Sequence, residues 1–410
     1  MANHFEFDSE IYNKKFMFIN FLEFCNKNGL NIFDYVPFTL ILSFKGKNFK
    51  NNFMNFKEIF TNINNLTAND SSKISLNNIT YNYNDLFKSD INNRKYSDNI
   101  IYIPTTHYTG KNYWLLKPTD LSGGKCIKIS ESIEGMEKTI KKFYDGIETD
   151  NQKFTTEKIK EVEEIMQLEG GKNSYKQKKK NPRRYISGTI IVQKYIESPL
   201  LYYGRKFDIR IWVLIDYNLN VFIFREGHLK TCSTEYSISS KNKYAHITNY
   251  MLQKHNKDFQ KFEEGNEVSF KDFQKCLDTQ YEPYKKNVHK DILPQIKKII
   301  QLTAMSVKGK INLHDRRYCY VVLGYDFMID SEFKAWLIEV NRNPGMVESS
   351  SLIRTLVPRM LDEVFRLTLD RIYEPKFIEN DHFIYKSPYT VEGYSDYETV
   401  FEFVCNLNTD

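Results

Sequence analysis

Acidic and amide side chains interrupt two apolar segments in the last quarter of the chain. The segments VVLGYDFMID (321–330) and FKAWLIEVNRNPG (333–345) are predicted to be buried strands, because apolar residues fill them and turn residues flank them. Asp326 lies inside the first, and Glu339 and Asn341 lie inside the second. Such side chains are rarely buried without a partner that compensates them. The pattern therefore predicts a ligand for these three oxygen-bearing groups.

A hairpin would bring the three groups together. Residues two apart in a strand share a face, so Glu339 and Asn341 are expected on the same side. If Asp330 lies opposite Ala335, then Asp326 lies opposite Glu339, although a slip of one residue would break this register. Two carboxylates about 4 Å apart repel by about 4 kcal/mol at an effective dielectric constant of about 20, and Mg²⁺ would reverse that sign. Ion pairs with nearby lysines are an equally good interpretation.

An upstream segment could hold the phosphate that such a metal accompanies. Lys117 lies in the apolar segment YWLLKPTDL (113–121), where a buried ammonium needs an anion. A loop of small residues follows it: Ser122, Gly123, Gly124 and Lys125. Its backbone N–H groups could line a phosphate, although most such loops are ordinary turns. The P-loop pattern G-x-x-x-x-G-K-[ST] does not occur in the chain.

Charged residues alternate with apolar ones in RKFDIRIWVLI (205–215). Lys206, Asp208 and Arg210 therefore share one face of the expected strand, and the other face is apolar. With Arg225 on the next strand, in FIFREG, they are expected to form a two-stranded basic patch with one acid. Arginine suits carboxylates and phosphates because its planar fork binds them through two hydrogen bonds.

Two further segments carry weaker signals. The end of a strand in VQKYIESPL (192–200) could present main-chain groups to an adenine edge, although a plain connector would look the same. The residues concerned are Gln193, Lys194, Tyr195 and Ile196. His246, in HITNYMLQKH, is interpreted as a packing or loop histidine, because no partner spacing marks it as a catalytic base. The absence of G-x-S-x-G, HExxH and the kinase HRD–DFG set disfavours esterases, zinc peptidases and protein kinases.

The composition is that of a globular protein of 410 residues, of which 41% are hydrophobic. The 58 basic and 52 acidic residues give a net charge of +6, which suits an acidic partner but is too small to indicate nucleic acid. Six cysteines without a CxxC pair argue against a zinc site and a disulfide framework, and favour a reducing compartment. The acidic N-terminus and the lack of an apolar run near about 18 residues predict a soluble, cytosolic protein.

Strands and long helices alternate along the chain, which predicts an α+β or mixed α/β fold. Strands are expected at 38–44, 185–196, 205–216 and 219–227, with three more within 99–129. Helices are expected at 131–145, 157–168, 269–281, 291–311 and 350–371. The basic segment 172–184 is either a solvated loop or an arm that attracts an acidic polymer.

Six segments together resemble the tubulin–tyrosine ligase-like family, in order and at fitting distances: QKYI, RKFDIRIWVLI, FREGHLKT, HITNYMLQK, FEEGNEVSF and LGYDFMID…AWLIEVNRNPG. The resemblance covers roughly residues 100–370. It implies an ATP-grasp fold with ATP and Mg²⁺ between two antiparallel sheets. It also implies an enzyme that joins an amino acid to a carboxylate of tubulin or of another protein. The implied partners are acidic tubulin tails and a free amino acid, with no nucleic acid or membrane, and the implied location is cytoplasmic, at the cytoskeleton or cilium.

The resemblance also assigns roles to individual residues. The expected Mg²⁺ ligands are Asp326, Glu339 and Asn341. The expected phosphate contacts are Lys117 and Lys194, covered by the loop that contains Gly123, Gly124 and Lys125. The adenine would be framed by Gln193, Tyr195 and Ile196, with Lys206 and Asp208 nearby. The amino acid's carboxylate and the reacting acyl group would be held by Arg210 and Arg225, and the residues beside the nucleotide and the acceptor would be Thr248 and Asn249.

The resemblance suggests four parts of the chain: an N-terminal docking or scaffolding module (1–100), a central ATP-grasp subdomain (101–200) with a basic insertion near 150–185, a C-terminal subdomain with the metal site (201–375), and a tail that packs on the core or is partly mobile (376–410). Cys126 stands where the family usually has a glycine, which would reshape the loop if that position needs a positive φ. A non-catalytic tubulin-binding relative and a ligase for a non-tubulin acceptor remain alternatives. Tyrosine, glutamate and glycine all remain possible substrates.

Overall fold

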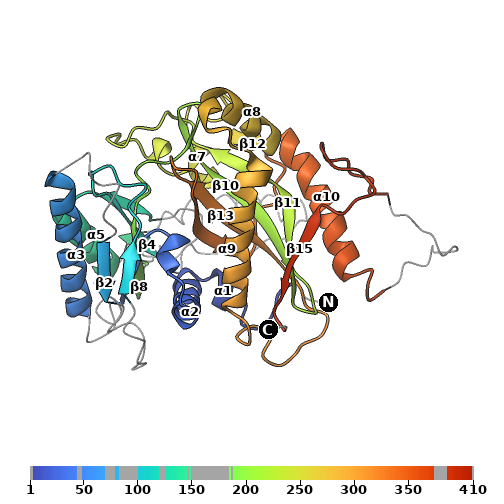
Figure 1. Cartoon of the computed structure of the whole chain (residues 1–410), viewed down its shortest axis with the longest axis horizontal. Helices are drawn as coiled ribbons and strands as arrows, with labels where there is room; N and C mark the ends of the chain where they lie inside the picture. The colour runs from blue at the N-terminus through green and yellow to red at the C-terminus, as the bar shows by residue number, and fades with distance from the viewer. Residues whose placement is uncertain are drawn as a thin grey trace, which may run out of the picture.

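The computed structural model describes the residues 3–43, 49–69, 79–82, 100–119, 126–145, 147–148, 184–185, 188–373 and 386–408. The helix expected at 157–168 and the basic segment up to residue 183 lie outside these ranges, as do Gly123, Gly124 and Lys125. The described residues form two main antiparallel sheets with helices packed on them (Figure 1). The predicted mixed α/β fold is confirmed.

The smaller sheet carries Lys117. Its strands are β1 (Thr39–Ser43), β8 (Thr189–Lys194), β4 (Trp114–Pro118) and β5 (Lys128–Ser130), in that spatial order. One face is buried against α3 (Phe49–Asn69) and α5 (Ile133–Asp145). There the Trp114 ring contacts the rings of Phe56 and Phe60 at centroid distances of 5.1 and 6.5 Å. The opposite face is left to line a pocket.

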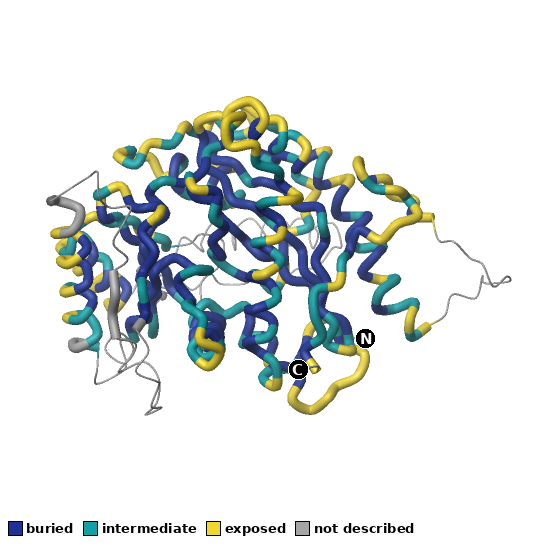
Figure 2. The backbone as a smooth tube through the Cα atoms, viewed as in Figure 1, coloured by how far each residue is buried: buried dark blue, intermediate teal, exposed yellow. Residues whose placement is uncertain are grey.

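The larger sheet carries the alternating charges and the hairpin. Its strands are β12 (Glu267–Ser269), β11 (Asn220–Thr231), β10 (Arg205–Ile215), β13 (Val321–Ile329) and β14 (Ala335–Asn341), with β15 (Phe401–Asn406) paired to β11 and β9 (Leu201–Tyr202) paired to β10. Apolar residues of one face, such as Ile211, are buried in one core cluster with residues of α8 (Phe270–Gln280) and α9 (Leu293–Met305). Residues of the other face, such as Trp212, are buried with residues of α10 (Ser351–Thr368). Buried backbone therefore runs through both sheets (Figure 2).

The N-terminal residues are part of the same architecture. Besides β1 they form α1 (Ser9–Tyr12), α2 (Lys14–Lys27), η1 (Ile32–Asp34), β2 (Ile79–Asn82) and β3 (Ile100–Ile103). α1 contacts β14 and α2 contacts α9. The first hundred residues thus contribute a strand to the sheet of Lys117, and the expected domain limits remain predictions.

Short elements complete the described fold: β6 (Ile147–Glu148), β7 (Arg184–Tyr185), η2 (Lys243–Ala245), α7 (Tyr250–Gln253), η3 (Glu264–Asn266), η4 (Glu282–Tyr284) and the π-helical turn η5 (Val288–Ile292). The helices expected at 131–145, 269–281 and 350–371 are confirmed within three residues at each end. The helix expected at 291–311 ends at Met305, before a turn in which Gly309 has a φ of 68°. None of the described helices is both long and apolar enough to cross a lipid bilayer.

The register of the β13–β14 hairpin differs from the prediction at the turn and agrees with it at the site. Ile329 lies opposite Ala335, so the expected pairing of Asp330 with Ala335 is wrong. Asp330 instead stabilises the turn, because its carboxylate accepts hydrogen bonds from the Lys334 N–H (2.9 Å) and the indole N–H of Trp336 (2.9 Å). A bulge after Leu337 adds one residue to β14, and the expected pairing of Asp326 with Glu339 is thereby confirmed.

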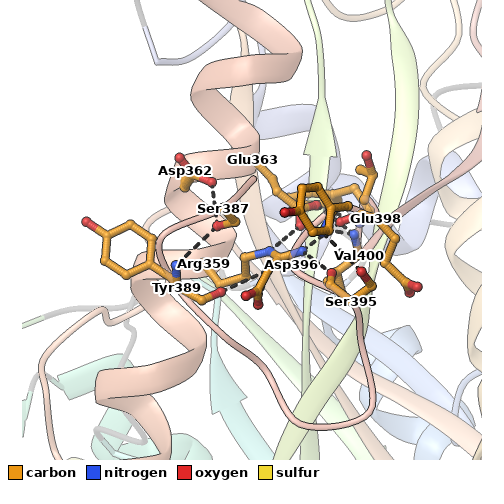
Figure 3. A network of polar contacts seen from close by, with 12 residues as sticks. Arg359, Asp362, Glu363, Ser387, Tyr389, Ser395, Asp396, Glu398 and Val400 are labelled. Atoms are coloured by element: carbon orange, nitrogen blue, oxygen red, sulfur yellow. Dashed lines mark hydrogen bonds and ion pairs between the residues drawn. The ribbon is translucent and has the colours of Figure 1, made fainter. Parts of the chain in front are cut away.

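A buried ion pair in α10 holds the C-terminal segment 386–408 (Figure 3). Arg359 Nε donates to Glu363 Oε1 (2.7 Å), and the remaining guanidinium nitrogens donate to the backbone oxygens of Tyr389, Ser395 and Glu398. The Glu363 carboxylate accepts from backbone N–H groups of Val400 and Phe401, at 2.9 and 3.0 Å. The described part of the expected tail therefore packs on the core.

Candidate active site

A pocket lies between the two sheets. The small sheet contributes residues of β4 and β8, and the large sheet contributes residues of β10, β11, β13 and β14. Eleven of the predicted site residues line it: Lys117, Gln193, Lys194, Tyr195, Ile196, Lys206, Asp208, Thr248, Asn249, Asp326 and Glu339. Residues that are far apart in the sequence are thus brought to one place.

Asp326 is bound by two cations at one end of this pocket. Arg210 lies opposite it on β10 and donates from Nε to Oδ1 (2.6 Å) and from Nη2 to Oδ2 (3.0 Å). Lys230 Nζ lies 3.1 Å from Oδ1, and the Asn341 amide donates to Oδ2 (3.0 Å). Burial by itself would raise the pKa of Asp326, but the charges of Arg210 and Lys230 outweigh burial and hold that pKa well below its usual value.

Glu339 and Asn341 converge on the same position, as the strand pattern predicts. The Asn341 amide donates to Glu339 Oε1 (3.3 Å), and Lys14 Nζ lies 3.4 Å from Glu339 Oε2. Within the described ranges, no group of three or more His, Cys, Asp or Glu residues could hold a metal ion. The donor set here is therefore two carboxylates and one amide, surrounded by lysines.

Lys230 is a site residue that the sequence analysis missed. It lies opposite Asp208 in the β10–β11 pairing, and its Nζ lies 3.1 Å from both Asp208 Oδ1 and Asp326 Oδ1. The strand was expected to end at residue 227, whereas β11 continues to Thr231. Because Arg225 and Lys230 are five residues apart, regular alternation would place them on opposite faces, so the expectation of Arg225 on the charged face excluded Lys230.

Lys117 is a buried ammonium on the pocket side of the small sheet. Its Nζ donates to Gln193 Oε1 (2.8 Å), and no carboxylate of the described chain lies within ion-pair distance. The Gln193 amide is oriented by Thr39, whose hydroxyl oxygen accepts from Nε2 (2.9 Å). Burial lowers the pKa of Lys117 to about 8, although the charge of Glu339 opposes this. The side chain is arranged to receive an anion.

Lys206 has a similar environment on the opposite sheet. Its Nζ donates to the Tyr195 hydroxyl (2.8 Å) and to the backbone oxygen of His246 (2.9 Å), and burial lowers its pKa to about 8. Thr248 donates to Asp208 Oδ2 (2.5 Å), and burial raises the pKa of that carboxyl in spite of Lys230.

Asn249 brings an unused acceptor to the pocket. Its Oδ1 is buried and has no hydrogen-bond partner among the residues that the structure describes. A buried amide oxygen without a donor is costly, so a ligand hydroxyl or ammonium at this point would be favourable.

The ammonium of Lys194 does not point to the phosphate side of the small sheet. Successive side chains of a strand lie on opposite faces, so Gln193 faces the pocket and Lys194 faces the core. Lys194 forms an ion pair with Glu197, and its Nζ lies 4.5 Å from the centre of the Tyr108 ring. Lys194 is thus engaged in an ion pair with Glu197, and its expected contact with a phosphate remains a prediction.

Arg225 is held by the C-terminal segment and does not line the pocket. Its Nε donates to the Val400 oxygen (3.1 Å), and its Nη2 donates to Glu398 Oε1 (3.1 Å). The β10–β11 pairing is irregular between Ile211 and Val213, which places Arg225 outside the regular alternation. The basic patch therefore contains Lys230 in the place expected for Arg225.

Cys126 has a φ of 61°, in the left-handed region that favours glycine. The family's usual glycine at this position is consistent with that backbone conformation. The preceding residues of the expected phosphate loop are not described, so its closure over a ligand remains a prediction.

Two antiparallel sheets that enclose a pocket with buried lysines and carboxylates have the arrangement of an ATP-grasp fold. The chain belongs to the tubulin-tyrosine ligase family, whose model matches residues 1–377.

The curated relatives are enzymes named for tubulin modification. The chain is 29% identical to tubulin glycylase 3B of Tetrahymena thermophila over 272 residues, which are 65% of this chain and 19% of the relative. It is 34% identical to tubulin glycylase 3A of Drosophila melanogaster over 195 residues, which are 45% of this chain and 19% of the relative. It is 25% identical to a probable alpha-tubulin polyglutamylase of Tetrahymena thermophila over 276 residues, or 66% and 57%. The chain thus spans about a fifth of the two glycylases.

Proposed function

We propose that the chain is an ATP- and Mg²⁺-dependent ligase that joins an amino acid to a carboxylate of tubulin. The main observation is the pair of buried ammonium groups, Lys117 and Lys206, which have no carboxylate partner at close range in the described part of the chain. They face a pocket that also contains the carboxylates of Asp326 and Glu339. Lysines on one side and carboxylates on the other suit a polyphosphate with its metal. Family membership and the tubulin ligases among the relatives support the same assignment.

The donor set fits Mg²⁺ after one rearrangement. A carboxylate offers about four lone-pair positions, and those of Asp326 are used by Arg210, Lys230 and Asn341. The Asn341 amide is the neutral partner, so turning it would release Asp326 and present an amide oxygen to a cation. Asp326, Glu339 and Asn341 would then supply the hard oxygen ligands that Mg²⁺ prefers. When bound, the metal would offset phosphate charge.

The proposed reaction activates a carboxylate and needs no covalent bond to the protein. The γ-phosphoryl group of ATP passes to the acceptor carboxylate, the α-amine displaces phosphate from the resulting acyl phosphate, and ADP, phosphate and an amide are the products. Lys117 and Lys206 would hold phosphate oxygens, and Arg210 would stabilise the oxyanion and orient the amino acid. The adenine would lie near Gln193, Tyr195 and Ile196.

The acceptor is proposed to be an acidic tubulin tail, which places the protein at microtubules or cilia. The net charge of +6 favours such a partner, and the attraction should weaken as salt is added. Glycine is the first amino acid to test because the reported relatives include two glycylases, with glutamate and tyrosine as the other candidates.

The deciding experiment incubates the purified chain with ATP, Mg²⁺, tubulin and labelled glycine, glutamate or tyrosine in turn. We expect label in tubulin together with ADP release. ATP binding without ADP release would indicate a non-catalytic relative. ATP turnover with other carboxylate acceptors but not with tubulin would indicate a different acceptor.

Glu339→Gln tests the metal assignment within the same assay. The variant should fold normally and lose ligation, because one of two carboxylates no longer carries charge. Glu332→Gln, in the exposed turn of the same hairpin, is the matched control and should keep activity. Wild-type turnover by Glu339→Gln would contradict the assignment.

A further inference from the structure

A chain of hydrogen bonds connects Lys206 to a loop that follows β11. Lys206 Nζ donates to the Tyr195 hydroxyl (2.8 Å), Tyr195 Oη lies 2.9 Å from His246 Nδ1, and His246 Nε2 lies 2.7 Å from the Ser240 oxygen. Lys206, Tyr195 and His246 are all buried. The three side chains come from β10, from the end of β8 and from the segment after η2, so the chain joins both sheets to one loop.

The direction of these hydrogen bonds follows from the chemistry of the groups. A backbone carbonyl only accepts, so His246 must carry its proton on Nε2 to donate to Ser240. The neutral imidazole then accepts at Nδ1, and the Tyr195 hydroxyl donates to it. The lone pairs of Tyr195 are left for Lys206, which also lies 4.2 Å from the centre of the Tyr195 ring.

The surroundings favour this arrangement. Burial lowers the pKa of His246, which keeps the ring neutral, and the charge of Lys206 acts in the same direction. The rings of Tyr195 and Tyr236 flank the imidazole at centroid distances of 5.8 and 5.7 Å. If His246 carried a second proton on Nδ1, that N–H group would donate to the Tyr195 oxygen and compete with the ammonium of Lys206 for it.

We infer that His246 is a positioning residue that acts through Tyr195 to fix the ammonium of Lys206 in the pocket. An ammonium has three N–H groups, and here two donate to Tyr195 and to the His246 backbone. The third is available to an anionic ligand, which is a phosphate oxygen of ATP if the proposed function holds. The inference rests on that function and adds a positioning role to the packing or loop role expected for His246.

The test is a double-mutant cycle on ATP affinity. His246→Leu removes the acceptor for Tyr195, and Lys206→Met removes the group that is positioned. In the otherwise wild-type chain His246→Leu should raise the Kd for ATP about tenfold, the effect of losing about one charge-assisted hydrogen bond. In a chain that already carries Lys206→Met the same change should have little further effect, because the positioned group is gone. His246→Asn, whose Oδ1 can replace Nδ1, should restore most of the affinity.

Two controls separate positioning from folding. His255→Leu changes an exposed histidine of the same segment and should leave the Kd unchanged. Tyr195→Phe removes only the hydroxyl oxygen and should raise the Kd for ATP as much as His246→Leu does. If the His246→Leu variant does not fold, Tyr195→Phe provides the test. In turnover, the KM for ATP should rise while the KM for tubulin stays constant.

The outcomes distinguish this inference from the proposed function. Equal Kd values for wild type and for both His246→Leu and Tyr195→Phe would overturn the inference alone. If His246→Leu lowered the affinity for ATP equally in the wild type and in the Lys206→Met variant, the inference would also be overturned, because a purely structural role of His246 gives that result. A wild-type chain that binds no ATP would overturn the proposed function, and the inference with it.

Discussion

Arg359 in α10 and Lys206 in β10 are both buried cations, but their partners differ. Arg359 pairs with the Glu363 carboxylate and donates to three backbone oxygens. Lys206 donates to a phenol and one backbone oxygen, and no carboxylate of the described chain lies within ion-pair distance. The first cation is compensated within the fold, and the second leaves part of its desolvation cost for a ligand to offset. Lys117 belongs with Lys206 in this respect.

The largest effect on stability should follow from breaking the compensated pair. Arg359→Met leaves Glu363 buried without its cation, and the free energy of unfolding should fall by about 3–5 kcal/mol. Chemical denaturation measures this change. Arg354→Met, on the exposed side of the same helix, removes a solvent-exposed ion pair with Glu264 and should change stability far less. If both variants were equally stable, the contrast between the two kinds of cation would be wrong.

Removing a cation that has no close carboxylate should have the opposite effect and make the ligand-free protein more stable. The pKa of Lys117 is about 8 in the fold and 10.5 without it. At about pH 7, Lys117→Met should therefore raise the unfolding free energy of the ligand-free protein by about 3 kcal/mol, while weakening ATP binding. The stability advantage of the variant should shrink between pH 8 and 10.5. In that range Lys117 has lost its proton in the folded wild type but keeps it in the unfolded chain, so the wild type becomes more stable as the pH rises. Denaturation at several pH values tests this, with the exposed Lys111→Met as control.

ATP affinity should fall as pH rises above 8, the approximate pKa of both Lys117 and Lys206 in the fold. A phosphate binds the protonated ammonium, so at higher pH binding must be accompanied by proton uptake. Each lysine should then contribute up to about tenfold loss per pH unit. Equilibrium binding without metal measures the slope, and Lys206→Met should reduce it. A flat profile would mean that these lysines do not hold the phosphates.

Relieving backbone strain beside the pocket should have the smallest effect. Cys126→Gly relieves strain in the folded state, because Cys126 has a left-handed backbone conformation. The same change makes the unfolded chain more flexible, so the two effects on the free energy of unfolding partly cancel. Stability should change by less than about 1 kcal/mol, and ATP affinity should stay within about twofold. Thermal unfolding and binding provide the measurements. A larger loss of affinity would show that backbone shape, as well as charge, determines the phosphate site.

Local patterns in the sequence predicted the hairpin and its polar face because alternation within a strand needs no long-range information. Asp326, Glu339 and Asn341 converge as expected, even though the turn register was one residue off. The bulge that restores the register could not be foreseen, since the sequence has no glycine or other mark at Ile338. Lys14 approaches from more than three hundred residues away, a distance over which periodicity carries no information.

The sequence also could not decide which way a side chain points when both faces of a strand are buried. Gln193 and Lys194 both have low exposure, and only the fold shows that the first faces the pocket and the second faces Glu197. Arg225 lies beside the irregular stretch of β11, where the alternating pattern fails. Arg359 and Glu363 have the spacing of an ordinary surface pair in a helix, so their burial was not visible either.

β15 covers the outer edge of β11 from Asn220 to Phe224. A chain shortened to residue 377, where the family match ends, would retain every residue that lines the pocket but would lose the β15 partners of that edge. Phe222 and Phe224 would lose their contacts with Phe403 and Phe401 as well. An open, apolar strand edge is a template for pairing with another copy, so such a shortened protein should aggregate. The C-terminal strand thus contributes to keeping copies of the protein apart in a crowded solution.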